Sequence, residues 1–461
     1  MGVDGEKHPM MAMMKAAQGK TRMHMPGHKG RGMKWLSAAM DMTELKDTDD
    51  LFGPESGIEK AQQAMAVSAS AGATLMLTGG STSGMLAMLL SAAQPGDSVI
   101  MPRGVHHSAV SGCILGGIQP IWIGEELDGE QMPVLREEAV LRAIARHPEA
   151  RAVLITRPDY YGRVMPLRKI VAAAHEKGML VLVDEAHGAH FNWWPEPESA
   201  GRLGADYWVQ SAHKTLGALT PGAWLHMSNP EWMEKTRARL RLIHTSSPSF
   251  LVMTSLDETR AWMDENGLRA LRRLMGWARA LRARVETMPG LYDAARTFEN
   301  FDPTRLAIDV SGRGITGWRA QAELSAAGVE VEMADHRRVV AILSVHDRKE
   351  DLERLGNALE ALPFEMSPVQ RAASPVFAQA VLSPRQAALG RVRKIPLEQA
   401  AGCICARSVG LYPPGIAWMA PGDRISRMQI FSMRRAIEAG GTPFGLAEQG
   451  QIWVTDEAEA E

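Results

Sequence analysis

The sequence predicts an α/β fold, in which a large domain with a mostly parallel sheet is followed by a smaller α+β domain. The 461 residues exceed the size at which one hydrophobic core usually stops growing, so more than one domain is expected. Short apolar runs alternate with helical patterns from about residue 61 onward. The run Val181–Val183 is apolar at successive positions, as in strands that are buried on both faces.

Strand and helix patterns follow one another in order along the chain. Strands of the large domain are expected within 97–103, 119–123, 151–158, 179–187, 205–214 and 222–227. A helix is expected within 167–178, with Gly178 as its C-terminal stop. Residues 230–290 are helical and rich in arginine, and strands return within 305–317, 328–335 and 339–345. We therefore predict an N-terminal arm (1–60), a large domain (61–295) and a smaller C-terminal region (296–461).

Composition excludes several classes of protein. The formal net charge of −2 argues against nucleic-acid binding through bulk charge. Apolar runs long enough to cross a membrane need about 18 residues, and the sequence has none. The N-terminal residues carry charges throughout and do not resemble a signal peptide, so we expect a cytoplasmic enzyme.

Lys214 and Asp184 are the first candidates for chemistry. Lys214 closes the segment SAHK (211–214) just past a predicted strand, where its amine could reach a cleft and form a Schiff base. Asp184 ends the apolar run VLVD, and a carboxylate there is costly unless it is paired. The alternatives are a surface lysine and an ordinary loop carboxylate. A helicase is a poor interpretation of DEAH (184–187), because no phosphate-binding G-x-x-x-x-G-K-[ST] loop is present.

Two further segments suit a phosphate and an aromatic ring. LTGGSTSGM (77–85) places glycines and hydroxyls before a helix, where backbone amides can bind an anion. His106 follows a strand and could stack on a ring, or it could be a surface histidine of a turn. Zinc binding by His187 and His190 is a weaker alternative, because no further ligand pattern accompanies them.

The order of these segments resembles fold-type I pyridoxal-phosphate (PLP) enzymes. HMPGHKG (24–30), DTDDLFGPESGIEKAQ (47–62), SAHK and YPPGI (412–416) resemble the Orn/Lys/Arg decarboxylase family more specifically. The resemblance extends from about residue 20 to about residue 430. It implies PLP as cofactor and decarboxylation of arginine, lysine or ornithine.

The resemblance also implies a role for each matching residue. Lys214 would bind the PLP aldehyde, Asp184 would pair with the pyridine nitrogen, and His106 would stack on the ring. Ala186 would pack under the ring, and His187 would lie near its 3-oxygen.

Other matching residues would bind the phosphate. These are Ser81 with the backbone of Gly80 and Thr82, together with Ser211 and His213. The segment HTSSP (244–248) resembles a loop that reaches the phosphate of a neighbouring subunit. Thr245 and Ser246 thus imply a homodimer or an assembly of dimers.

Several alternatives remain open from the sequence. An aminotransferase or lyase of the same fold would share Lys214 and Asp184, and Arg407 or Arg424 could then bind the substrate carboxylate. A catalytically silent paralogue is the third interpretation. The sequence does not decide which basic amino acid is the substrate. Asp423 and Glu44 are candidates for binding its distal cation. Gly104 and His107 depart from the Asn and Lys that the family commonly carries on either side of the stacking histidine.

Overall fold

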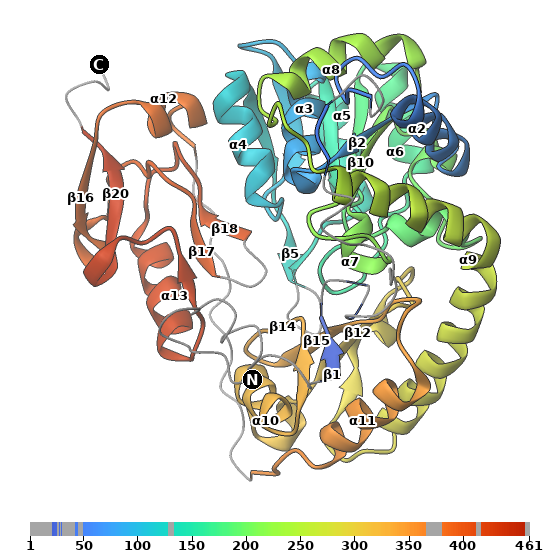
Figure 1. Cartoon of the computed structure of the whole chain (residues 1–461). Helices are drawn as coiled ribbons and strands as arrows, with labels where there is room; N and C mark the ends of the chain where they lie inside the picture. Colours follow the sequence, from blue (N-terminus) through green and yellow to red (C-terminus); the bar gives the residue numbers. More distant parts are fainter. Residues whose placement is uncertain are drawn as a thin grey trace, which may run out of the picture.

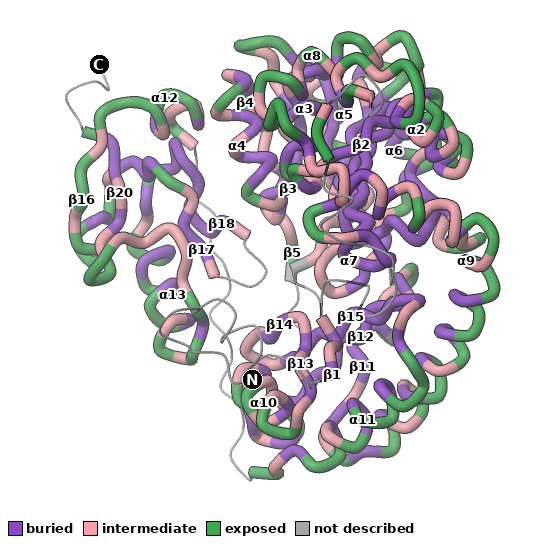
Figure 2. The backbone as a smooth tube through the Cα atoms, in the orientation of Figure 1, coloured by how far each residue is buried: buried purple, intermediate pink, exposed green. Residues whose placement is uncertain are grey.

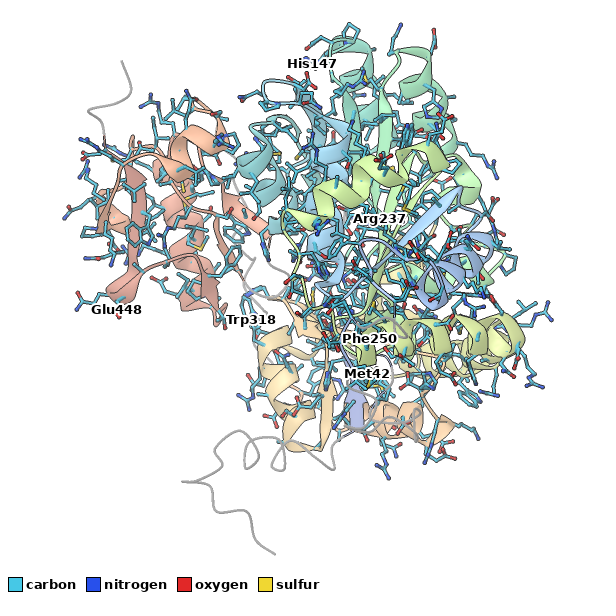
Figure 3. The ribbon with its side chains drawn as sticks, turned by 45° about the horizontal axis from the view of Figure 1, so that its top comes forward. Met42, His147, Arg237, Phe250, Trp318 and Glu448 are labelled. Carbon is cyan, nitrogen blue, oxygen red and sulfur yellow. The ribbon has the colours of Figure 1, made fainter. Side chains whose placement is uncertain are left out.

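The computed structural model describes residues 21–24, 27, 29, 42–44, 49–127, 133–365, 380–411 and 416–456. Three bodies can be followed in Figure 1: a large α/β domain, a second sheet below it, and a C-terminal unit beside it. Figure 3 labels a residue on each of them, namely Arg237, Trp318 and Glu448.

The large domain is built on a seven-stranded sheet. Its order is β2 (Ala73–Leu77), β10 (Ala223–Met227), β9 (Tyr207–Gln210), β8 (Leu180–Asp184), β7 (Ala152–Thr156), β3 (Ser98–Pro102) and β4 (Gln119–Ile123). β10 is antiparallel to both of its neighbours, and the other adjacent pairs are parallel. The carboxyl ends of six strands therefore meet at one edge, and the predicted α/β fold is confirmed.

Helices cover both faces of this sheet. One face packs against α2 (Gly57–Ser68), α5 (Glu137–Arg146), α6 (Arg168–Glu176) and α9 (Phe250–Val285). The other packs against α3 (Gly80–Ala92), α4 (His107–Gly116) and α8 (Met233–Arg241). In β8, Val181 and Val183 join the first core while Leu182 joins the second, as the alternation of side chains in a strand requires. Figure 2 shows this buried centre in purple.

Gly178 follows α6 as the sequence predicts. Its φ of 70° lies in the left-handed region, and its N–H donates to the carbonyl of His175 at 3.0 Å. A side chain would be strained in this conformation, which is why glycine commonly follows a helix.

The second body is an antiparallel sheet in the order β11 (Tyr292–Asp293), β12 (Arg305–Asp309), β15 (Arg338–Ile342) and β14 (Met333–Ala334). It packs with α10 (Gly317–Ala326), α11 (Lys349–Glu360) and the later turns of α9, which runs from one body to the other (Figure 1). From the N-terminal segment, β1 (Thr21–Met23) pairs in parallel with β13 (Val329–Val331). The domain limits at 60 and 295 stay predictions.

The C-terminal unit contains two small sheets. The strands are β16 (Val392–Pro396) with β20 (Gln451–Thr455), and β18 (Ile416–Met419), β17 (Val409–Leu411) and β19 (Pro443–Phe444). Its helices are α12 (Pro384–Leu389) and α13 (Arg427–Glu438). Arg385 of α12 donates to the carbonyl of Leu115 in α4 at 2.8 Å, so this unit contacts the large domain.

The remaining elements are short. A hairpin joins β5 (Glu126–Leu127) to β6 (Pro133–Val134), and α7 is Ala212–Thr215. Single 3-10 turns lie at Ala189–Trp193, Gly201–Leu203, Pro230–Trp232, Ala294–Thr297, Ser311–Arg313, Leu397–Gln399 and Glu448–Gly450. Within the described ranges, every helix is too short or too polar to cross a bilayer.

Candidate functional site

Asp184 is the last residue of β8, at the carboxyl edge of the sheet. Its side chain is buried, and its Oδ1 accepts the N–H of Ala186 at 3.1 Å. Burial raises the pKa of Asp184, while the nearby Lys214 opposes this rise. A buried carboxylate at this edge is costly without a cationic partner, so the position suits a protonated ligand atom.

Lys214 lies in the short helix α7, which follows the neighbouring strand β9. Its backbone N–H donates to the carbonyl of Ser211, and its Nζ lies 3.1 Å from Nε2 of His187. Burial lowers the pKa of Lys214, and the carboxylates of Asp184 and Glu332 partly offset this effect. A lysine with a lowered pKa is a nucleophile closer to neutral pH.

His187 is held between two basic side chains. Its Nε2 faces Lys214, and its Nδ1 lies 3.1 Å from a terminal nitrogen of Arg305. The Tyr160 ring contacts His187 edge-on, with ring centroids 5.3 Å apart. Arg305 is not predicted from the sequence, because an arginine that opens a strand of the second sheet carries no local signal for a role in the large domain.

The turn between β2 and α3 supplies the predicted phosphate loop. Gly80 begins α3 with a φ of 71°, a conformation that favours glycine. Ser81 is half-buried and Thr82 is exposed in the first turn of the helix, where backbone N–H groups lack partners within the helix. A Cβ on Gly80 would lie 3.5 Å from Pro221, so the loop packs on the 220–222 turn.

Ser211 and His213 connect this loop to Lys214. His213 contacts the carbonyl of Gly222 with its Nδ1 at 2.9 Å and donates its backbone N–H to the same oxygen at 3.2 Å. The hydroxyl of Ser211 is buried and has no hydrogen-bond partner among the described residues. Leaving a buried hydroxyl unpaired costs roughly 1–3 kcal/mol, so a polar ligand group is expected there.

His106 caps the N-terminus of α4. Its Nδ1 accepts the N–H of Ser108 at 3.2 Å and contacts the Ser108 hydroxyl at 2.8 Å. Burial, with smaller contributions from His107 and Lys214, lowers the pKa of His106 to about 3. The lowered pKa leaves the His106 ring neutral at neutral pH. Its backbone pairs with Ile416 of the C-terminal unit, so its position depends on both bodies.

Gly104 lies against the side chain of Glu125. A Cβ at this position would lie 2.2 Å from Oε1 of Glu125, so the Glu125 carboxyl occupies the space of a side chain. Burial, together with Asp159, raises the pKa of Glu125 to about 7. A larger residue at 104 would displace this carboxyl.

The predicted loop 244–248 lies next to the phosphate loop of its own chain. Nε2 of His244 accepts the N–H of Thr78 at 3.2 Å, whereas Thr245 and Ser246 are exposed. A pocket of about 310 Å³ opens beside it, lined by Glu44, Asp50, Phe52, Arg241, His244 and Ser246. His244 was not singled out in the sequence, although it stands in the same segment as the predicted pair.

Comparison with known proteins gives the family. The model described as Orn/Lys/Arg decarboxylase, major domain, matches residues 10–309, and the model of the C-terminal domain matches residues 367–444. The chain belongs to the Orn/Lys/Arg decarboxylase family. As a family member it is a PLP-dependent decarboxylase of a basic amino acid, so the predicted family, reaction class and cofactor are confirmed.

Individual relatives agree with this decarboxylase family. The arginine decarboxylase of Bacillus subtilis is 31% identical over 451 residues, covering 92% of each chain. The arginine decarboxylase of Halalkalibacterium halodurans is 31% identical over 456 residues, with the same coverage.

Solved structures show the shared fold. The Escherichia coli constitutive lysine decarboxylase aligns with a TM-score of 0.73 at 17% identity, covering 86% of this chain and 72% of that one. The lysine decarboxylase of Francisella novicida aligns with a TM-score of 0.76 at 17% identity, covering 91% and 74%.

The residues of this decarboxylase fit PLP. Lys214 offers an amine for the aldehyde, Asp184 a buried carboxylate for the ring nitrogen, and Ser211 an unpaired buried hydroxyl for the phosphate. The zinc alternative is not supported, because His187 contacts Lys214 and Arg305 while His190 pairs with Asp302 at 3.0 Å. No group of metal-binding side chains occurs among the described residues.

Three residues that the sequence offered as candidates for binding the substrate contact other groups of the protein. Asp423 is fully buried, with its Oδ2 paired with Arg103 and its Oδ1 without a hydrogen-bond partner among the described residues. Arg407 stacks 3.9 Å from the centre of the Trp453 ring, and Arg424 donates to the carbonyl of Gly402 at 3.0 Å. The motif YPPG (412–415) lies outside the described residues, and only its neighbour Ile416 can be placed.

Proposed function

We propose that the substrate is arginine and the product agmatine, with Lys214 as the residue that binds PLP. The grouping of the half-buried Lys214, the buried Asp184 and the buried, unpaired Ser211 hydroxyl supports the position of the cofactor. Identity of 31% with arginine decarboxylases over nearly the whole chain favours arginine among the basic amino acids.

Each residue of the site would make a distinct contribution. PLP, when bound, supplies the group that accepts the electron pair left as the carboxylate departs from Cα. Lys214 would bind the aldehyde carbon, and the Asp184 carboxylate would stabilise a proton on the ring nitrogen. The neutral His106 and Ala186 would pack against the ring, and a ring N–H of His187 would donate toward the 3-oxygen.

The phosphate would be held by the start of α3 and by α7. Ser81, with the backbone of Gly80 and Thr82, donates from the helix N-terminus, and the Ser211 hydroxyl and His213 complete the set. Thr245 and Ser246 are exposed and would reach the phosphate of a second subunit. We therefore propose a homodimer or an assembly of dimers.

Glu44 is the proposed partner of the distal guanidinium. Its Oε2 accepts the Thr43 hydroxyl at 2.6 Å, and its Oε1 is buried without a partner among the described residues. Replacing it with glutamine keeps its size but removes its charge. Glu44→Gln should therefore raise KM for arginine more than it lowers kcat.

Release of carbon dioxide from arginine, lysine and ornithine, with PLP added, tests the substrate. We expect kcat/KM for arginine to exceed the others by at least tenfold, or about 1.4 kcal/mol in transition-state binding. Agmatine should be the product by mass spectrometry. A higher kcat/KM for lysine or ornithine would show that arginine is not the preferred substrate. Transamination without release of carbon dioxide would contradict decarboxylation of a basic amino acid.

A further inference from the structure

Three basic side chains form a row that crosses between two bodies of the molecule, in which His187 and Arg305 are buried and Lys214 is half-buried. Nζ of Lys214 lies 3.1 Å from Nε2 of His187, and Nδ1 of His187 lies 3.1 Å from a terminal nitrogen of Arg305. Lys214 and His187 belong to the large domain, whereas Arg305 opens β12 of the second sheet. Arg305 is 1% exposed, so water does not replace this contact.

The chemistry of arginine decides which ring nitrogen of His187 carries the proton. A guanidinium has only donors and stays protonated in proteins, so Nδ1 of His187 must accept from it. A neutral imidazole that accepts at Nδ1 carries its proton on Nε2. The Nε2–H then points at Nζ of Lys214 and needs an acceptor there.

Only the free amine of Lys214 can be that acceptor. An ammonium has three donors and no lone pair, so it would place two donors against each other at 3.1 Å. The reverse arrangement, with Lys214 donating to Nε2, would put the proton on Nδ1 against the donors of Arg305. The contact of Arg305 with His187 therefore disfavours the charged form of Lys214.

The guanidinium of Arg305 is held in place by its own surroundings. Carboxylates of Asp302, Glu332 and Asp159 act on its charge. Asp302 is itself fixed, because it accepts from the Thr304 hydroxyl at 2.7 Å and pairs with His190 at 3.0 Å. Burial lowers the pKa of Arg305, and these carboxylates, none of which belongs to His187, offset that cost in part.

The charged and titratable groups around the row agree with this arrangement. Those that act on Lys214 are Asp184, Glu332 and Arg305, with His187 in direct contact. Those that act on His187 are Lys214, Arg305, His106 and His213. Burial is the largest cause that holds the pKa of His187 well below its usual range, and the charge of Arg305 acts in the same direction, so the ring is neutral.

We propose that Arg305 is a positioning residue that holds His187 as its Nε2–H tautomer and thereby keeps Lys214 as a free amine before the cofactor binds. The second half of this statement rests on the proposed role of Lys214 as the lysine that binds PLP. The free amine is the form that attacks an aldehyde carbon, and water leaves after the attack. Arg305, although it lies outside the large domain, would accordingly favour capture of the cofactor by Lys214.

Nitrogen NMR of the cofactor-free protein tests the tautomer directly. The histidines alone carry the NMR-active isotope, and the signal that disappears in His187→Asn identifies His187. Between about pH 6 and 9 we expect a protonated Nε2 and an unprotonated Nδ1. A proton on Nδ1, or protons on both nitrogens, would overturn the proposal, and this measurement needs no Arg305 variant to fold.

Variants test whether Arg305 causes the tautomer. Arg305→Met removes the donor, so His187 should populate its Nδ1–H form and Lys214 should become an ammonium. The rate at which the cofactor-free protein captures PLP at neutral pH should fall about tenfold, and the pH of half-maximal capture should rise by about one unit. Arg305→Lys keeps a charged donor and should behave like the parent. Arg313→Met is the matched control, since Arg313 is 6% exposed in the same body but bonds to backbone carbonyls.

A double-mutant cycle separates the hydrogen bond from the charge. If Arg305 acts through His187, Arg305→Met should cause no further shift in capture pH once His187→Leu is present. An undiminished shift in that background would show that Arg305 acts on Lys214 by charge alone, and the proposal would be wrong. The NMR result needs neither PLP nor substrate, so it can fail while Lys214 is still the residue that binds PLP.

Discussion

Arg103 and Asp423 form a buried ion pair that joins the β3–α4 turn to the C-terminal unit. Their side chains are 2% and 0% exposed, and Oδ2 of Asp423 also accepts the N–H of Ala420 at 2.8 Å. The guanidinium of Arg103 lies 4.7 Å from the centre of the Trp122 ring. His106 stands three residues after Arg103 and pairs with Ile416, so the C-terminal unit helps to set the position of His106.

Removing Arg103 should destabilise the protein strongly. Arg103→Met leaves the Asp423 carboxylate buried without its cation, at a cost of about 3–5 kcal/mol near neutral pH. Because burial already raises the pKa of Asp423, the variant should lose stability as pH rises. The apparent melting temperature measures both effects.

The double variant Arg103→Met, Asp423→Leu is the control for this pair. Replacing both charges with apolar side chains of similar size should recover much of the loss. A double variant less stable than Arg103→Met would contradict the view that the unpaired carboxylate causes the damage.

Lys214→Ala should abolish attachment of PLP by borohydride reduction. In the parent, reduction should fix PLP on the peptide that contains Lys214, as found by mass spectrometry after proteolysis. Lys29 is the matched control, because it is also buried, with its Nζ donating to the carbonyl of Ile342 at 2.8 Å. Lys29→Met should keep the label on Lys214, and a label on any other lysine of the parent would disprove the assignment.

Asp184→Asn should retain PLP but lose most decarboxylation. Asparagine is nearly isosteric with aspartate, yet it has no charge to hold a proton on the ring nitrogen. Activity within about threefold of the parent, or roughly 0.7 kcal/mol, would contradict this role. Asp206→Asn is the control for loss of a buried carboxylate: Asp206 accepts the N–H of Val181 at 2.7 Å, and its loss should reduce stability rather than kcat.

His226 should make the protein sensitive to acid. Burial lowers its pKa to about 3, while its ring contacts the Thr74 hydroxyl at 2.8 Å and Oε1 of Gln210 at 3.1 Å. Below about pH 6.5 the unfolded chain binds a proton at this residue that the folded chain does not. The free energy of unfolding therefore decreases as the pH is lowered, by up to about 1.4 kcal/mol per pH unit.

His226→Gln should remove this contribution. Between about pH 6 and 5 the parent should lose roughly 1 kcal/mol more than the variant, measured as the free energy of unfolding. Equal slopes for the parent and His226→Gln would show that His226 does not carry the effect.

Mixed dimers should reveal whether the site is shared between subunits. Lys214→Ala and the double variant Thr245→Ala, Ser246→Ala should each be impaired alone. After subunit exchange, up to about a quarter of the sites should regain an intact lysine and an intact neighbouring loop, because half of the dimers are mixed. No recovery on mixing, or a fully active monomer by light scattering, would place the loop at the site of its own chain.

The sequence by itself predicted an α/β fold, six of the seven strands of the large sheet and the two residues proposed to hold the cofactor ring, but it did not predict β2. Asp184 ends the apolar strand β8, and Lys214 follows β9 by four residues, so the parallel neighbours bring both residues to one edge of the sheet. The family motifs then indicated the reaction class. These signals are local in the chain, so they can be recognised without knowing how the bodies pack together.

Only the tertiary structure placed Arg305 against His187 and Arg103 against Asp423. These partners stand 118 and 320 residues apart, and each pair joins two bodies of the molecule. Local patterns report which face of an element is apolar, but they do not report which buried charge it will meet across a boundary. Asp423 shows the consequence: it was a candidate for the substrate cation in sequence, yet packing of the C-terminal unit commits its carboxylate to Arg103.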